Sequence, residues 1–118
     1  MEDPEEHALV LQALRSGLSN CVVWVHDHAS RRMRKDRELG GRQPLDLKRL
    51  LLEYVRQGGE VIQVRERRSE YRDEFEFYYK VIITTDDIPS GIFIEMRLSD
   101  ADRDCPIVHL VNAHRQRR

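Results

Sequence analysis

The apolar residues of this chain follow two different periods, and the change between them falls at Gly58-Gly59. Before that pair, apolar side chains recur at the spacing of a helix with one apolar face; they are Leu47, Leu50, Leu51, Tyr54 and Val55. After it, apolar side chains alternate over 74–84 as in a half-buried strand; they are Phe75, Phe77, Tyr79, Val81 and Ile83. Helices followed by strands with short connections predict an α+β fold.

Three helices are expected in the first half of the chain. Asp3 and Pro4 have the chemistry of an N-cap and a first helical residue. Apolar or aromatic residues follow them at helical spacing, namely His7, Leu11, Leu14 and Leu18. A second helix is predicted over 28–38, before Gly40-Gly41, and a third begins with Asp46 as its cap.

Four strands are expected, over 61–67, 74–84, 92–98 and 107–114. Residues 21–25 are apolar and β-branched, which leaves a buried strand and a lead-in to the next helix both open. The predicted fold class is therefore α+β, with N-terminal helices packed on one face of a four-stranded, mainly antiparallel β-sheet.

The length of 118 residues fits a single domain, with an N-terminal helical extension over 1–20, a core over 22–114 and a basic tail over 115–118. The net charge of −1 predicts no bulk attraction to nucleic acid, so any anion site must come from local clustering. No apolar run approaches the ~18 residues of a membrane span, and the acidic N-terminus is unlike a signal peptide. We expect a soluble, cytoplasmic protein whose Cys21 and Cys105 are reduced thiols.

The stretch His28-Ala-Ser-Arg-Arg-Met-Arg-Lys35 concentrates positive charge next to a histidine. On a helix, His28 and Arg32 are four residues apart and share one face, with Arg31 and Lys35 beside them. Two interpretations remain: a solvated basic helix face, or a site that holds a phosphate.

The motif His28-Ala29-x-x-Arg32-Met33, followed by the helix from Asp46, by "GGEVI" and by strands, resembles a family of small proteins with an H-A-x-x-R-M motif. That family is similar to the RelE-like toxins and the barnase-like and EndoU-like ribonucleases, and the resemblance covers roughly residues 22–114. It implies a RelE-like core and a metal-independent endoribonuclease, as in the toxin of a toxin–antitoxin pair. RNA would be its substrate and an antitoxin its protein partner.

Such RNA cleavage needs a base, an acid and cations for the phosphate, and no metal or other cofactor is expected. His28 and Arg32 supply one half of this set, while Lys80 and His114 are expected to complete the catalytic residues. His109, placed by alternation on the opposite face of the last strand, is the rival of His114. The RNA contacts are expected from Arg31, Lys35 and Tyr78. The competing interpretation of Lys80 is a cross-strand charge pair with Glu95.

Two other functions stay open. His26 and His28 would share a face on a strand and could bind a metal together with His109 or His114. The fold can also serve as a non-catalytic protein–protein interaction module, which the balanced charge and mixed-sign stretch "VRERRSEYRDEFE" favour. A nuclease would lose activity without His28 or Arg32, whereas an interaction module would tolerate both changes.

Overall fold

The computed structural model of this chain describes residues 3–25 and 39–116. Its elements are α1 (Pro4–Arg15), the 3-10 turn η1 (Ser19–Cys21), β1 (Val22–Trp24), α3 (Pro44–Arg56), β2 (Ile62–Arg65), β3 (Phe77–Ile83), β4 (Ile92–Asp100) and β5 (Ile107–Arg115). Within these residues the strands form one five-stranded sheet in the order β1-β5-β4-β3-β2. The predicted α+β class is confirmed.

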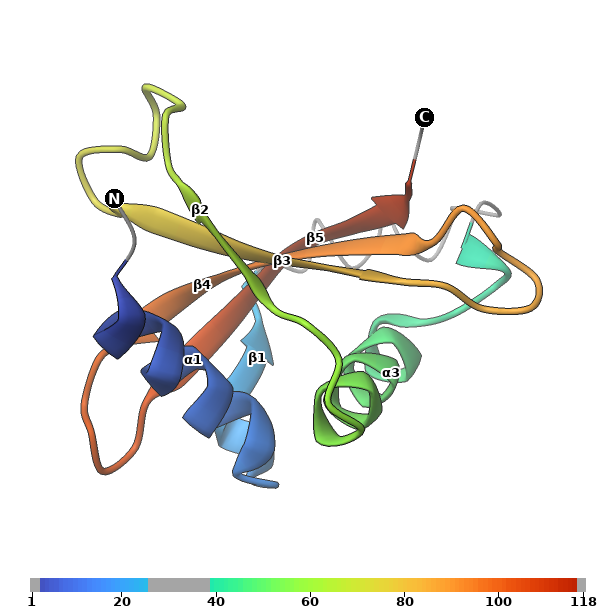
Figure 1. The fold of residues 1–118 in the computed structure, drawn as a ribbon, viewed down its shortest axis with the longest axis horizontal. Coiled ribbons are helices and arrows are strands. Elements are labelled where there is room, and N and C mark those ends of the chain that lie inside the picture. Colours follow the sequence, from blue (N-terminus) through green and yellow to red (C-terminus); the bar gives the residue numbers. More distant parts are fainter. Residues whose placement is uncertain (1–2, 26–38, 117–118) are drawn as a thin grey trace.

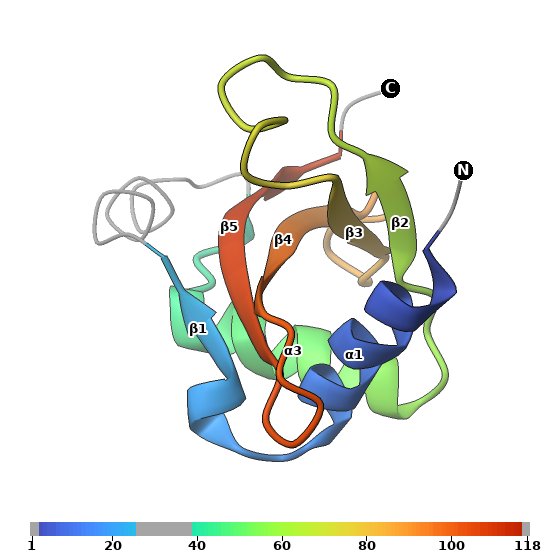
Figure 2. The same ribbon diagram turned by 90° about the vertical axis from the view of Figure 1, so that its left-hand side faces the viewer.

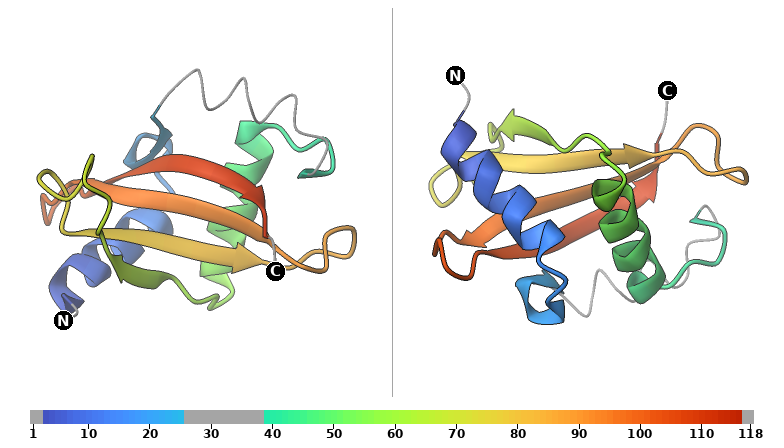
Figure 3. Two further views of the ribbon diagram at one scale, coloured as in Figure 1. Left: turned by 90° about the horizontal axis from the view of Figure 1, so that it is seen from above. Right: turned by 60° about the horizontal axis from the view of Figure 1, so that its bottom comes forward.

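Both α1 and α3 lie against the same face of the sheet, as Figure 1 and the two views of Figure 3 show. The core fills the space between these helices and the inward side chains of the strands. Its largest fully buried side chains are Val10, Val22, Leu39, Leu47, Leu51, Val55, Tyr79, Ile88, Ile92, Ile94, Met96 and Leu110. The prediction that the helices pack on one face of the sheet is confirmed for α1 and α3.

The sheet has one strand more than predicted. The additional strand is β1, which forms within residues 21–25, where the sequence had left a strand and a lead-in to a helix both open. This strand pairs in parallel with β5, placing Val22 opposite Val108 and Trp24 opposite Leu110. The pairs β2–β3, β3–β4 and β4–β5 are antiparallel, as expected. Figure 2 shows β1 beside β5 at one edge of the sheet.

The start of α1 is as predicted, but its buried face is different. The side chain of Asp3 accepts a hydrogen bond from the backbone N–H of Glu6, and Pro4 is the first helical residue. The helix ends at Arg15 and buries Val10, Ala13 and Leu14. Leu18 therefore falls outside the helix and is 56% exposed, so its assignment to the apolar face was wrong.

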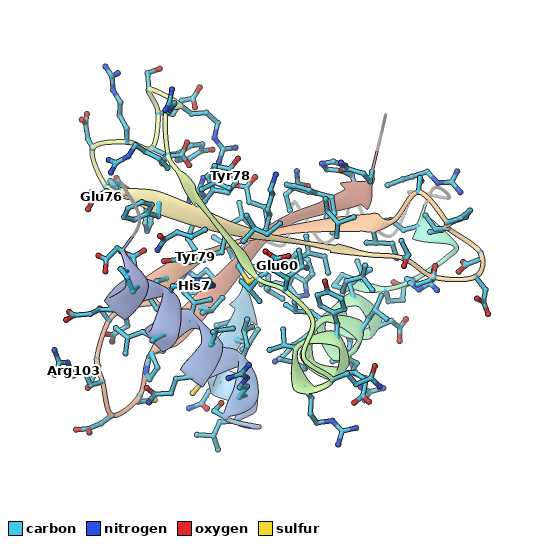
Figure 4. All side chains as sticks on the ribbon, viewed as in Figure 1. His7, Glu60, Glu76, Tyr78, Tyr79 and Arg103 are labelled. Carbon is cyan, nitrogen blue, oxygen red and sulfur yellow. The ribbon has the colours of Figure 1, made fainter. Side chains whose placement is uncertain are left out.

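A polar cluster fixes the first turn of α1 to the sheet. The side chain of Gln63 accepts a hydrogen bond from the backbone N–H of Asp3 and donates to the backbone oxygen of the same residue, each at 2.8 Å. The buried Tyr79 hydroxyl donates to Glu6 at 3.1 Å, and His7 Nε2 donates to the backbone oxygen of Val61 at 2.8 Å. Figure 4 shows His7 next to Tyr79. Burial raises the pKa values of both Glu6 and Tyr79.

The apolar stripe of α3 faces the sheet as its spacing predicts, with Leu47, Leu51 and Val55 buried. The N-cap is Gln43, however, and not Asp46. Asp46 lies three residues inside, where its carboxylate accepts a hydrogen bond from the backbone N–H of Gln43 at 2.9 Å. The helix predicted over 28–38 lies outside the described residues.

We expect truncation of Phe77 to destabilise the fold, because its side chain is 3% exposed within the core. Phe77→Ala should lower the free energy of unfolding by roughly 3–5 kcal/mol, measured by urea denaturation. Phe77→Leu keeps most of the apolar volume and should cost less than about 1.5 kcal/mol. If the alanine variant lost no more than the leucine variant, the inward placement of Phe77 would be wrong.

Candidate functional site

The candidate site lies on the far face of the sheet, defined as the face that points away from α1 and α3. Strand alternation and register place the following side chains there: Ile62 and Val64 of β2, Tyr78, Lys80 and Ile82 of β3, Phe93, Glu95 and Arg97 of β4, and His109, Asn112 and His114 of β5. Figure 4 shows the two sides at neighbouring residues, with Tyr79 beside His7 on the helix side and Tyr78 on the other. Three of the residues predicted for the site, Tyr78, Lys80 and His114, therefore share one face.

A bulge in β5 changes the position of His109. Glu95 lies opposite Asn112, but the next residue of β4, Met96, lies opposite Leu110, so Val111 is an extra residue. The side chain of His109 consequently shares the far face with His114. Its predicted placement on the opposite face was wrong, because alternation from the sequence alone assumes an unbroken register.

His114 is held in one orientation at the end of β5. Its ring stacks on that of Phe93, the residue opposite it in β4, with the ring centroids 4.7 Å apart and the planes at 19°. Its Nδ1 lies 2.9 Å from the backbone oxygen of Arg115. A carbonyl oxygen can only accept, so Nδ1 carries the proton and, in the neutral ring, Nε2 carries the lone pair.

Lys80 lies in the row next to His114, directly opposite Glu95. The cross-strand charge pair, which was the competing interpretation of Lys80, does not form, because the Glu95 carboxylate pairs with Arg68 and Arg97 instead. Over residues 3–25 and 39–116, no carboxylate forms an ion pair with the Lys80 ammonium group. Within the described residues, the Lys80 charge is therefore not neutralised by a carboxylate.

Four charged side chains form a closed network beside Lys80. Nη2 of Arg68 lies 2.8 Å from Oε2 of Glu66 and 2.8 Å from Oε2 of Glu95. Nη2 of Arg97 lies 3.2 Å from the same two oxygens. Glu66, Glu95 and Arg97 are buried, whereas the side chain of Arg68 is 42% exposed. The hydrogen bonds from Arg68 are the main cause that lowers the pKa of Glu66 to about 2.

The loop between β2 and β3 covers this network with aromatic rings. The Arg97 guanidinium carbon lies 4.1 Å from the ring centroid of Tyr71 and 5.2 Å from that of Phe75. The Arg68 guanidinium carbon lies 4.9 Å from the ring centroid of Tyr78 in β3. Beside them is an open depression of about 590 Å³, lined by Val64, Arg65, Glu66, Arg67, Arg68 and Tyr78. Figure 2 shows the loop projecting beyond the ends of β2 and β3.

The remaining predicted site residues, His28, Arg31, Arg32 and Lys35, lie outside the described residues. The same is true of His26, so the alternative metal site with His26 and His28 also lies outside the described residues. In the described part of the chain, no group of three or more His, Cys, Asp and Glu side chains is arranged to hold a metal ion. None of its helices is long and apolar enough to cross a membrane.

Arg68 and Arg97 were not predicted from the sequence as partners of Glu95. One signal was available, since Arg97 follows Glu95 by two residues and must share its face of an otherwise apolar strand. The part that Arg68 and Glu66 play in the ion-pair network could not be predicted from periodicity. Both lie beyond the last paired residue of β2, where the loop turns back over the sheet. Phe93 was likewise seen only as part of an apolar strand.

Comparison with known proteins adds no relative: no family model, curated protein or solved structure matches the chain.

We expect Glu66→Gln to destabilise the protein at pH 7 by about 3 kcal/mol, measured by urea denaturation. The pKa of Glu66 is lowered from 4.5 to about 2 in the folded chain, so its ionised form stabilises the fold. That stabilisation is complete above pH 4.5 and is lost as the pH falls toward 2. The difference between the wild type and the variant should therefore shrink over this range.

Glu76→Gln is the matched control, because Glu76 is exposed in the same hairpin and its ion pair with Arg65 is longer, at 3.5 Å. It should change the free energy of unfolding by less than about 1 kcal/mol at pH 7. Equal losses in the two variants would contradict a special role for the buried network.

Proposed function

We propose that the far face of the sheet binds single-stranded RNA and that the protein is a metal-independent endoribonuclease. The observation that carries this proposal is the placement of Tyr78, Lys80 and His114 on one sheet face, where Lys80 has no carboxylate partner among the described residues. Aromatic rings and a cation on a sheet surface suit stacked bases and a phosphate backbone. The resemblance of the His28–Met33 motif to ribonuclease toxins supports the same conclusion.

In this mechanism His114 acts as the general base. With Nδ1 donating to the backbone oxygen of Arg115, Nε2 is the nitrogen that can accept the proton of a ribose 2′-hydroxyl. The stack on Phe93 limits rotation of the ring, which keeps Nε2 in one direction. The 2′-oxygen would then attack the neighbouring phosphorus and displace the 5′-oxygen.

Lys80 stabilises the charge that develops on the phosphate during this attack. Two strand spacings and two residues along the strand separate Lys80 from His114, which corresponds to about 12 Å between their Cα atoms. Both side chains are long enough to contact one nucleotide across that span. Tyr78, two residues before Lys80, would contact the neighbouring base.

His28 and Arg32 belong to the same proposal as the acid and the second phosphate ligand. β1 runs parallel to β5, and Trp24 lies opposite Leu110, four residues before His114. The end of β1 therefore points toward the end of the sheet that carries His114, which supports a common site with the residues that follow β1.

The test is cleavage of a labelled single-stranded RNA of mixed sequence. His114→Ala should lower the rate by roughly 10²–10⁴-fold through loss of the general base. Lys80→Ala should lower it about 10²-fold, and Lys80→Arg should restore most of the rate because the charge is kept. Urea denaturation of each variant would verify that the fold is retained.

His109→Ala is the matched control, since it removes a histidine from the same strand and the same face. It should leave the rate within a few-fold of wild type. A large loss with His109→Ala and none with His114→Ala would overturn the assignment of the base. Unchanged cleavage in folded Lys80→Ala and His114→Ala would remove the far face from the mechanism.

We also expect cleavage to continue in the presence of a chelator, because histidine, arginine and lysine supply the proton transfers and the charge. The measurement is the rate of RNA cleavage with EDTA, before and after addition of Zn²⁺ or Mn²⁺. Loss with the chelator and recovery with the metal would instead favour the alternative metal site around His26 and His28.

The second candidate is a non-catalytic protein–protein interaction module. The loop between β2 and β3 favours it, because it exposes charges of both signs, among them Arg67, Glu70, Arg72 and Asp73. A protein without RNA cleavage whose partner binding depends on these residues would fit this second function.

A further inference from the structure

The two cysteines, far apart in the sequence, are in contact in the folded chain. The sulfur atoms of Cys21 and Cys105 lie 3.7 Å apart, and both residues are free thiols. Cys21 is buried at 1% exposure, whereas Cys105 is partly exposed in the loop between β4 and β5. A disulfide has an S–S length of about 2.05 Å, so the sulfurs must approach by about 1.7 Å to form one.

The parallel pairing of β1 with β5 brings these thiols together. Cys21 directly precedes β1, and Cys105 lies two residues before β5. Because Val22 is opposite Val108 and the strands run in the same direction, their starting ends lie side by side. The contact is therefore a consequence of the sheet topology.

We propose that Cys21 and Cys105 form an intramolecular disulfide when the protein reacts with hydrogen peroxide. The Cys105 sulfur is the one that the oxidant reaches, because Cys21 is buried. As a thiolate it attacks one peroxide oxygen, so an S–O bond forms while the O–O bond breaks. The hydroxide that leaves takes up the proton lost by the Cys105 thiol and departs as water.

The Cys21 sulfur then attacks the Cys105 sulfur, and the S–S bond forms as the S–O bond breaks. The hydroxide released in this step takes the Cys21 proton and gives a second water. Two electrons pass from the thiol pair to one peroxide molecule, so the reaction is balanced. The disulfide would tie the start of β1 covalently to the loop that leads into β5.

The surroundings of Cys105 make this reaction slow at neutral pH. The hydrogen bond and the electrostatic interaction with Cys21 raise the pKa of the Cys105 thiol, and burial and the negative charges of Asp102 and Asp100 act in the same direction. Little thiolate is therefore present at pH 7, and the oxidation is faster under mildly alkaline conditions. The pair suits a response to sustained oxidation more than rapid sensing.

The test uses hydrogen peroxide on the purified full-length chain at mildly alkaline pH, followed by unfolding, alkylation of remaining thiols and trypsin digestion. Mass spectrometry should find the peptides 16–31 and 104–115 joined, with the loss of two hydrogens. Dithiothreitol should separate them. The joined peptide should come from monomeric chain, and the same treatment in urea should produce much less of it.

Two single variants separate the steps. In Cys21→Ser, peroxide should oxidise Cys105 further to the sulfinic acid, because no second thiol is in contact with its sulfur. In Cys105→Ser, Cys21 should stay fully alkylatable after unfolding. The denaturation midpoint of the wild type should rise on oxidation and return on reduction. If the wild type instead accumulated the sulfinic acid of Cys105 or only intermolecular disulfides, the proposal would be overturned.

Discussion

Two buried carboxylates, Glu66 and Glu95, share the guanidinium groups of Arg68 and Arg97 on the far face of the sheet. Removing any one of these charges would leave a net charge on the three groups that remain, most of them buried, which is more costly than loss of a surface ion pair. The network also holds the loop between β2 and β3 against the sheet, because Glu66 and Arg68 come from that loop and Glu95 and Arg97 from β4.

The two faces of the sheet therefore perform different tasks. The face toward α1 and α3 is apolar, and its inward strand residues, such as Val81, Ile94 and Leu110, are fully buried. The far face combines charges that neutralise one another with aromatic rings. Because the Glu95 carboxylate pairs with arginines, the Lys80 ammonium group has no carboxylate partner among the described residues, in a chain with a net charge of −1.

Local periodicity was sufficient to predict α3, the alternation of β3 and the antiparallel pairs, because each depends on neighbouring residues. It could not predict the bulge at Val111, which reversed the expected side of His109, or the parallel partner of β1, since both depend on contacts between distant segments. For the candidate site, Lys80 and His114 were predicted from their residue type, and the structure places both on the far face. Arg97 and Phe93 were not predicted as site residues. Arg97 takes part through its ion pairs with Glu66 and Glu95, and Phe93 through its stack on His114.

The parallel pair of β1 and β5 has a consequence for how the chain is made. β1 is synthesised early, yet the strand beside it is β5, which follows every other described element. During translation, β1 therefore stays unpaired until β5 has emerged from the ribosome. The antiparallel strands from β2 onward can pair with their sequence neighbours in the meantime, so closure of the β1 edge is expected to be the last step of sheet assembly.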